Sequence, residues 1–159
     1  MARITADQEA TERRDNLGAV TGVGIANKPT RVVSTVEAAD TTAGGHTILF
    51  GEIPSGARIV GGHLYWDDLA TTGSPELDIG LAGASITADP DAISNGNDVS
   101  SAGSGLLITD AAHVGQPAWD LVNGQTSDPK ENFQVYGTIT TAATTQVGTV
   151  TLELDYIVD

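Results

Sequence analysis

The sequence predicts an all-β protein, an antiparallel β-sandwich that carries an extended N-terminal arm. From Thr30 onward, short segments alternate between apolar and polar residues, which is the period of a half-buried strand. The composition includes 19 glycines and only 4% aromatic residues, which suits short strands joined by tight turns. About seven or eight such segments follow one another without a helical crossover. This pattern favours a jelly roll, with an immunoglobulin-like or other Greek-key sandwich left open.

The strands are expected where the alternation is clearest. The C-terminal segment is the most regular, because Val150, Leu152, Leu154, Tyr156 and Val158 share one face. A continuous apolar face of this length predicts a strand in the middle of its sheet. The full set of clear strands is 30–37, 46–53, 57–67, 76–81, 132–140 and 146–158, with a hairpin over 141–145.

The strand expected over 57–67 contains two adjacent glycines, Gly61 and Gly62. Glycines inside a strand predict a bulge or the close approach of another backbone. Simple alternation places Val60 and Leu64 on the same face of this strand.

Residues 82–130 are harder to assign, because Asx, Gly and Pro turn signals recur along them. We expect short strands near 105–108 and 119–122, and a helical turn near 91–94. The run 89–98 resembles a calcium loop at first sight. Counted from Asp91, however, the third position is Ile93 and the twelfth is Ala102, where an EF-hand requires oxygen ligands. An Asx-rich turn region is the favoured interpretation, with a looser oxygen site left open.

Charge divides the chain into two parts. Residues 1–31 hold five of the seven bases and four acids, which sums to +1, and residues 32–159 hold two bases and 17 acids, which sums to −15. The total of −14 repels nucleic acid and anionic membranes, so neither is expected as a partner. The N-terminus has no apolar core region of a secretory signal, so assembly in the cytoplasm is expected.

The first 30 residues are expected to form the arm, and residues 31–159 the body. The arm carries no apolar stripe that could bury a core by itself. One interpretation is a disordered tail. The other is a segment that becomes ordered only against a neighbouring subunit, anchored by Val20, Val23 and Ile25.

No constellation of catalytic residues is recognisable. The chain has no cysteine, its three histidines lack metal-ligand spacing, and it has neither a phosphate-binding glycine loop nor a nucleophile elbow. An acidic pair such as Asp67-Asp68 could in principle supply the two carboxylates of a glycosidase. Some such pair is expected by chance among 21 acids, so solvated surface charge is the favoured interpretation. The prediction is a protein that is not an enzyme and that needs no metal or cofactor.

Three stretches carry a resemblance to a known family. Residues 49–62 read Leu-Phe-Gly-Glu-Ile-Pro-Ser-Gly-Ala-Arg-Ile-Val-Gly-Gly, residues 150–159 form a closing Tyr-containing strand, and residues 78–81 are followed by the Asp-Pro-Asp block at 88–92. In these stretches the chain resembles the capsid decoration, or cement, proteins of tailed bacteriophages. The stretches cover about half of the chain.

This resemblance implies a structural virion protein with a jelly-roll-like body. It implies binding to the outer surface of the expanded head, where the major capsid protein is the partner. It also implies self-association, commonly as a homotrimer, and arms that link neighbouring subunits. The alternative is a receptor- or glycan-binding sandwich of a head or tail fibre, and a hydrolase is the third and least favoured class.

Two sets of residues are expected to serve these contacts. Large aromatic side chains are favoured interface anchors, so Tyr65, Trp66, Trp119 and Tyr136 are the candidates for the trimer interface, although Trp66 equally suits the sandwich core. The bases of the arm are candidates for pairing with acids of the capsid, although ordinary solvated side chains would look the same. The expected capsid-binding arm residues are Arg3, Arg13, Arg14, Val20, Val23, Ile25, Lys28 and Arg31.

Overall fold

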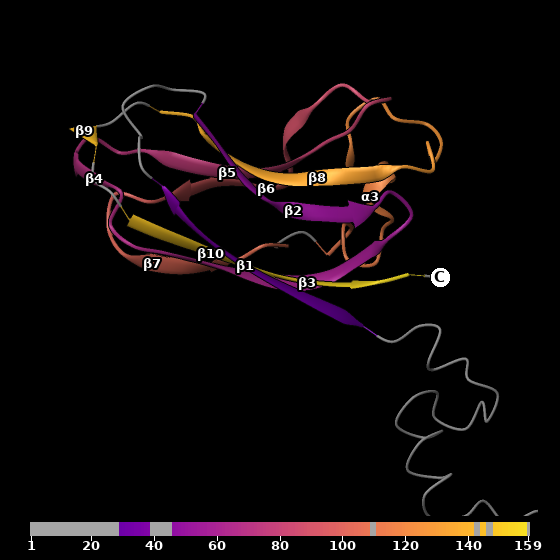
Figure 1. The fold of residues 1–159 in the computed structure, drawn as a ribbon, viewed down its shortest axis with the longest axis horizontal. Helices are drawn as coiled ribbons and strands as arrows, with labels where there is room; N and C mark the ends of the chain where they lie inside the picture. The colour runs from indigo at the N-terminus through magenta and orange to yellow at the C-terminus, as the bar shows by residue number, and fades with distance from the viewer. Residues whose placement is uncertain (1–28, 39–45, 109–110, 142–143, 146–147, 159) are drawn as a thin grey trace, which may run out of the picture.

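A computed structural model describes residues 29–38, 46–108, 111–141, 144–145 and 148–158. These residues form two antiparallel four-stranded sheets packed face to face (Figure 1). We name each sheet after one of its two central strands. The β10 sheet has the order β1 (Thr30–Ala38), β10 (Gly148–Ile157), β3 (Arg58–Trp66) and β7 (Gly103–Leu106), and the β8 sheet has the order β2 (His46–Pro54), β8 (Asn132–Ile139), β5 (Glu76–Ala82) and β6 (Asp89–Asp98).

The path of the chain through the two sheets is that of a jelly roll. Apart from the β5–β6 pair, consecutive strands of the two large sheets lie in opposite sheets. The short strands β4 (Ala70–Thr72) and β9 (Thr144–Thr145) pair at one end of the sandwich, and α3 (Ala118–Leu121) lies at the other end (Figure 1). The predicted all-β sandwich is therefore confirmed, and its topology is the favoured one. The only helix in the described residues, α3, is too short to span a membrane.

The core lies between the sheets and follows the alternation of the sequence. In β10, Val150, Leu152 and Leu154 are buried and alternate with Thr and acidic residues that face outward. This strand has neighbours on both sides, as its apolar face predicted. Each fully buried Leu, Ile or Phe stabilises the fold by about 1.5–3 kcal/mol. The largest fully buried side chains are Phe133, Ile53, Ile59, Leu64, Leu69, Leu77, Ile79, Leu81, Leu107, Ile139, Leu154 and Val99.

The glycine pair in β3 marks a bulge, as expected. The register with β10 shifts between Asp155 and Tyr156, and β3 contributes the extra residue there. The shift reverses the alternation, so Ile59 is buried and Val60 is only partly buried. The prediction that Val60 shares the inner face with Leu64 is wrong for this reason.

Two local predictions in residues 82–130 are also wrong. The helical turn expected near 91–94 is part of β6, where Ala92 and Ile93 are buried against the sandwich. The strand expected near 119–122 is the short helix α3, which follows Pro117. The N–H groups of Ala118 and Trp119, at the start of this helix, donate to carbonyl oxygens of the β2–β3 connection. The strand expected near 105–108 exists, but it begins earlier, as β7.

Candidate interaction surfaces

Most of the predicted arm lies outside the described residues. This applies to Arg3, Arg13, Arg14 and Lys28 and to the apolar anchors Val20, Val23 and Ile25. The described chain starts at residue 29 and enters β1 at once. The role assigned to these residues therefore stays a prediction.

Arg31, which was grouped with the arm, belongs to the body. It lies in β1 opposite Asp155 of β10, and its Nε and Nη2 donate to the two carboxylate oxygens of Asp155 at 2.7 Å each. Its Nη1 lies 3.6 Å from Glu153 Oε2. The hydrogen bond from Arg31 holds the pKa of the Asp155 carboxyl below its usual value. The guanidinium thus already has an acidic partner within its own chain.

On the outer face of the β10 sheet, side chains of neighbouring strands lie in rows across the sheet. One row across the sheet runs from Val33 through Glu153 and His63 to Leu106. Its two end residues, Val33 and Leu106, are 57% and 55% exposed. The rings of His63 and Tyr65 stack with centroids 5.7 Å apart. This face therefore combines apolar, aromatic and charged groups.

The two tryptophans are packed within the subunit. The Trp66 Nε1 donates to the Ser101 carbonyl oxygen at 3.0 Å, and its ring lies so close to β7 that a Cβ on Gly103 would come within 3.1 Å of it. Trp119 packs against the core from α3. Both side chains are only partly exposed, so a large share of their apolar area stabilises the fold itself.

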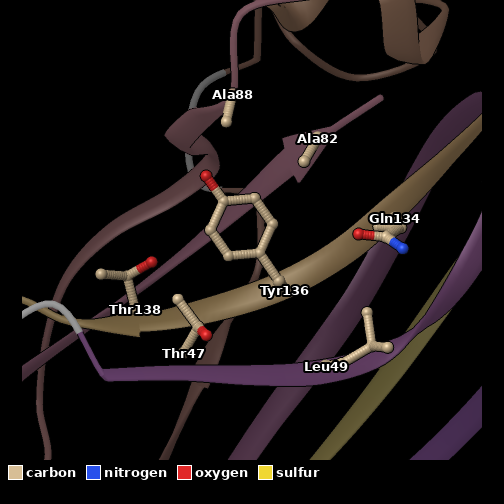
Figure 2. Close-up of a pocket in the computed structure, with 7 residues that line it drawn as sticks. All are labelled: Thr47, Leu49, Ala82, Ala88, Gln134, Tyr136 and Thr138. Carbon is tan, nitrogen blue, oxygen red and sulfur yellow. The ribbon is translucent and has the colours of Figure 1, made fainter. Parts of the chain in front are cut away.

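Tyr136 lies in a hollow on the outer face of the β8 sheet (Figure 2). The ring stands on β8, and its hydroxyl points toward the segment that carries Ala88 (Figure 2). Burial raises the pKa of the Tyr136 hydroxyl, and the nearby charges of Asp89 and Asp91 act in the same direction. The hollow opens to solvent and has a volume of about 540 Å³. It is lined by Thr47, Leu49, Ala82, Ala88, Gln134, Tyr136 and Thr138.

Of the residues that line this hollow, only Tyr136 was predicted as a site residue, and Leu49 is the exposed large apolar one that was not. It is 55% exposed, although its neighbours Ile48 and Phe50 are buried. The signal was present, because alternation along β2 turns Leu49 outward. A leucine in that position is an apolar side chain offered to solvent or to a partner.

Beside the hollow, β6 covers part of β5. A Cβ on Gly80 would lie 2.1 Å from the Asp89 carbonyl oxygen, so only a glycine fits beneath this segment. Asp78 is buried on the same face, and its Oδ1 accepts a hydrogen bond from the Gly96 N–H at 2.7 Å. Burial raises the pKa of Asp78. Within the described ranges, no group of three His, Asp or Glu side chains is placed to hold a metal ion.

The four aromatic residues predicted for the trimer interface do not share one surface. Tyr65 and Tyr136 lie on the outer faces of different sheets. Trp66 ends β3 beside β7, whereas Trp119 lies near the start of β3. Tyr65, at 42% exposed, is the one of the four with the most accessible ring. The role of these four residues in a subunit interface stays a prediction.

Comparison with known proteins adds the fold relationship. Neither a scan of known protein families nor a search of curated proteins finds a match. Among solved structures, the chain is similar to a chain in the capsid of Ralstonia phage GP4, with 21% identity and a TM-score of 0.62 over 84% of this chain and 86% of that one. It is also similar to a chain in the capsid asymmetric unit of cyanophage Pam1, with 23% identity and a TM-score of 0.59 over 100% of this chain and 95% of that one. At these identities, the likeness shows that the chain has the fold of chains found in phage capsid structures.

Proposed function

We propose that this chain is a structural protein of a bacteriophage virion, which binds the outer surface of the capsid and stabilises it by bridging major capsid protein subunits. The observation that carries the proposal is the extent of the fold likeness to chains in two phage capsid structures. The likeness spans 84% to 100% of this chain and 86% to 95% of the other two. The counterpart in each capsid is therefore almost a whole chain rather than one domain of a larger protein.

The charge of the chain favours the outside of the shell. The net charge of −14 opposes close contact with packaged nucleic acid. In the body, acids such as Glu37, Glu52 and Asp98 are exposed, which suits a solvated outer surface. The protein would be assembled onto heads in the host cytoplasm and remain part of the virion.

The proposed mechanism is multivalent binding. The body contacts one capsid subunit, and residues 1–28, which carry four of the seven bases of the chain, extend to a neighbour, so that weak contacts add up to high avidity. Arg3, Arg13 and Arg14 would pair with carboxylates of the capsid in the bidentate manner that Arg31 shows with Asp155. Copies would associate as a homotrimer, with Tyr65 as its most accessible aromatic anchor.

The proposal is tested by co-sedimentation with empty expanded heads of the same virus. The full chain is expected to sediment with heads in a saturable manner and to raise the temperature at which the heads rupture. A chain that lacks residues 1–28 is expected to bind more weakly and to protect less. The matched control replaces Arg3, Arg13 and Arg14 by Gln, which keeps the length of the arm and removes three of its charges.

Two outcomes would count against the proposal at different levels. If the full chain did not sediment with heads at micromolar concentration, the capsid-binding function would be wrong. If the chain without residues 1–28 bound and protected heads as well as the full chain, only the bridging role of the arm would be wrong.

The hollow around Tyr136 supports a second candidate, a glycan-binding module. An aromatic ring next to an amide and a hydroxyl group, here those of Gln134 and Thr47, is a surface on which a sugar can stack and form hydrogen bonds. Of the four candidate aromatics, only Tyr136 lies in this hollow, so the support is weaker than for the capsid role. Binding on a glycan array that is lost in Tyr136→Ala would favour it.

A further inference from the structure

The two sheets end in four edge strands, which differ in how they are protected. The free side of an edge strand carries unpaired N–H and C=O groups, and these pair with a strand of another chain unless something prevents it. The β7 edge has only four residues. The β6 edge contains Pro90 and faces β5 with two register shifts, and the β2 edge has a register shift between Leu49 and Gly51 and ends at Pro54. Shortness, prolines and bulges are the usual means of blocking such pairing.

The fourth edge, β1, is neither short nor broken by a proline or a bulge, and its charged residues are one base, Arg31, and one acid, Glu37. Its nine residues contain no glycine, proline or lysine. It pairs with β10 from Thr30 opposite Tyr156 to Ala38 opposite Gly148 without a single shift. Within the described part of the chain, β10 is the only strand that pairs with it. β1 is therefore a regular, full-length template for one more strand.

We propose that the free edge of β1 binds a second copy of this chain, with the two β1 strands antiparallel about a two-fold axis at Ser34. The inference stands apart from capsid binding, because both partners are copies of the same molecule. An isologous contact of this kind joins copies in pairs. On a shell it would link neighbouring trimers rather than build one.

The sequence of β1 is complementary to itself in this register. With Ser34 opposite its own copy, all nine residues of β1 overlap. Side chains that face the inside of one sandwich then lie beside side chains that face the inside of the other. Arg31 then lies opposite Glu37 of the second copy, and this ion pair occurs twice in the contact. Opposite charges in directly opposed positions stabilise antiparallel pairs, whereas like charges destabilise them. Sliding one strand by two residues would place Arg31 opposite Thr35 or Glu37 opposite Val33, which removes both ion pairs.

The individual side chains also fit this arrangement. Val32 and Val36, which face the inside of the sandwich, would lie opposite each other and extend the apolar layer across the contact. On the outer face, Val33 would gain Thr35 of the second copy as its neighbour, which covers a side chain that is 57% exposed in the single subunit. Glu37 is exposed and forms no ion pair with the described residues. Arg31 has donors to spare, because its Nη1 is only loosely engaged by Glu153 at 3.6 Å.

The experiment uses cysteine pairs in the full chain, which has no cysteine of its own. Residues directly opposite in an antiparallel pair have Cα atoms about 4.5–5.5 Å apart, within the range of a disulfide. Val33→Cys and Thr35→Cys are prepared separately, mixed and oxidised at about 0.15 M salt, where the Debye length of about 8 Å limits repulsion between the acidic chains. The mixture is expected to form disulfide-linked dimers at least about tenfold faster than either variant alone, because only residues 33 and 35 are directly opposed.

The matched control is the pair Thr47→Cys and Leu49→Cys on the protected β2 edge, which is expected to give no such enhancement. A further variant, Glu37→Lys, places two lysines opposite the two Arg31 side chains and is expected to slow the cross-linking of the 33/35 mixture severalfold. Both cysteine positions are exposed in β1, and circular dichroism and sedimentation velocity check that each variant stays folded.

Three results would overturn the proposal. The first is a 33/35 mixture that cross-links no faster than the single variants or the β2 control. The second is a rate unaffected by Glu37→Lys. The third is faster cross-linking of Val33→Cys to a Val23→Cys variant than to Thr35→Cys, which would assign the edge to the N-terminal segment of a neighbour instead. None of these results bears on whether the chain binds heads.

Discussion

The outer faces of the two sheets are formed by the same alternating sequence pattern, but their side chains are packed very differently. On the β10 sheet, side chains of neighbouring strands meet in pairs, such as Arg31 with Asp155 and the hydroxyl groups of Thr35 and Thr151, which lie 2.9 Å apart. On the β8 sheet, the middle of the outer face of β5 is covered by the neighbouring strand β6, and Asp78 and Gly80 are buried there.

The difference comes from the register of the edge strands. β1 matches β10 residue for residue. In the β8 sheet, the pairs Ile79–Ser94 and Leu81–Asp89 show that two steps along β5 correspond to five along β6. The extra residues of β6 fold back over Gly80. A regular register thus leaves a face and an edge open for another molecule, whereas an irregular one uses them inside the subunit.

The largest effect is expected from adding one methyl group to the covered face. Gly80→Ala would place a Cβ 2.1 Å from the Asp89 carbonyl oxygen and 2.4 Å from the Pro90 carbonyl carbon, which are backbone atoms that cannot rotate away. We expect a loss of about 3 kcal/mol or more in the free energy of unfolding, measured by urea denaturation. Gly61→Ala in β3 is the control, because its Cβ would meet nothing within 4 Å, and a change within about 0.5 kcal/mol is expected. Equal losses in the two variants would contradict the contrast between the faces.

The next effect concerns the buried carboxylate of the same face. Asp78→Ala leaves the Gly96 N–H without its acceptor, so we expect a loss of about 1–3 kcal/mol, whereas Asp78→Asn keeps an acceptor oxygen. Because burial raises the pKa of Asp78 in the folded state, its ionised form destabilises the fold above that pKa, and the destabilisation disappears as the pH falls below the unfolded value. The advantage of Asp78→Asn over the natural chain should therefore be largest near neutral pH and shrink on acidification. Urea midpoints of both proteins, measured from neutral to acidic pH, check the trend. A stability advantage of Asp78→Asn that grew on acidification would contradict it.

A smaller effect of opposite sign is expected at the hollow. The Thr138 Oγ1 is buried and has no hydrogen-bond partner among the described residues. Thr138→Val keeps the shape of the side chain and removes the unpaired hydroxyl, so we expect a gain of about 1 kcal/mol in thermal or urea unfolding. Thr151→Val is the comparison on the β10 sheet, where the hydroxyl is bonded to Thr35 and its removal should not stabilise. A loss of stability in Thr138→Val would show that the hydroxyl is satisfied.

The smallest effect is expected on the open face. Arg31→Gln removes the pair with Asp155, but the guanidinium is solvated, and exposed ion pairs contribute little. The lowered pKa of Asp155 means that this contribution is present above the unfolded pKa and is lost as the pH falls through the folded one. A double-mutant cycle with Asp155→Asn at low and high salt measures the coupling, which should vanish in high salt. A coupling that survived high salt would show that the pair is shielded from solvent.

The alternation of the sequence was enough to predict the sandwich, and in detail the central place of β10. The burial of Val150, Leu152 and Leu154 followed directly from it. Where alternation breaks, prediction became unreliable. The glycine pair indicated a bulge in β3, but not that Ile59 would replace Val60 in the core.

For the candidate surface residues, the structure adds contacts within the subunit that the sequence pattern did not reveal. Aromatic residues were chosen because of their size, yet Trp66 and Trp119 are largely occupied with their own subunit. Arg31 was assigned to a partner and is bonded to Asp155, which lies 124 positions away in the chain. Leu49 shows the opposite case. The alternation along β2 already indicated that its side chain is exposed, yet Leu49 was not among the predicted surface contacts.

The sequence by itself determined which side of the regularly alternating strands faces the core, the acidic character of the body and the concentration of bases near the N-terminus. These properties depend on the order of neighbouring residues and on composition alone. Only the tertiary structure decided which strands are adjacent, how β6 folds over β5, and which of the four edges remains regular. Those features depend on pairing between segments far apart in the chain, and a local pattern of alternating residues is the same whichever strand lies beside it.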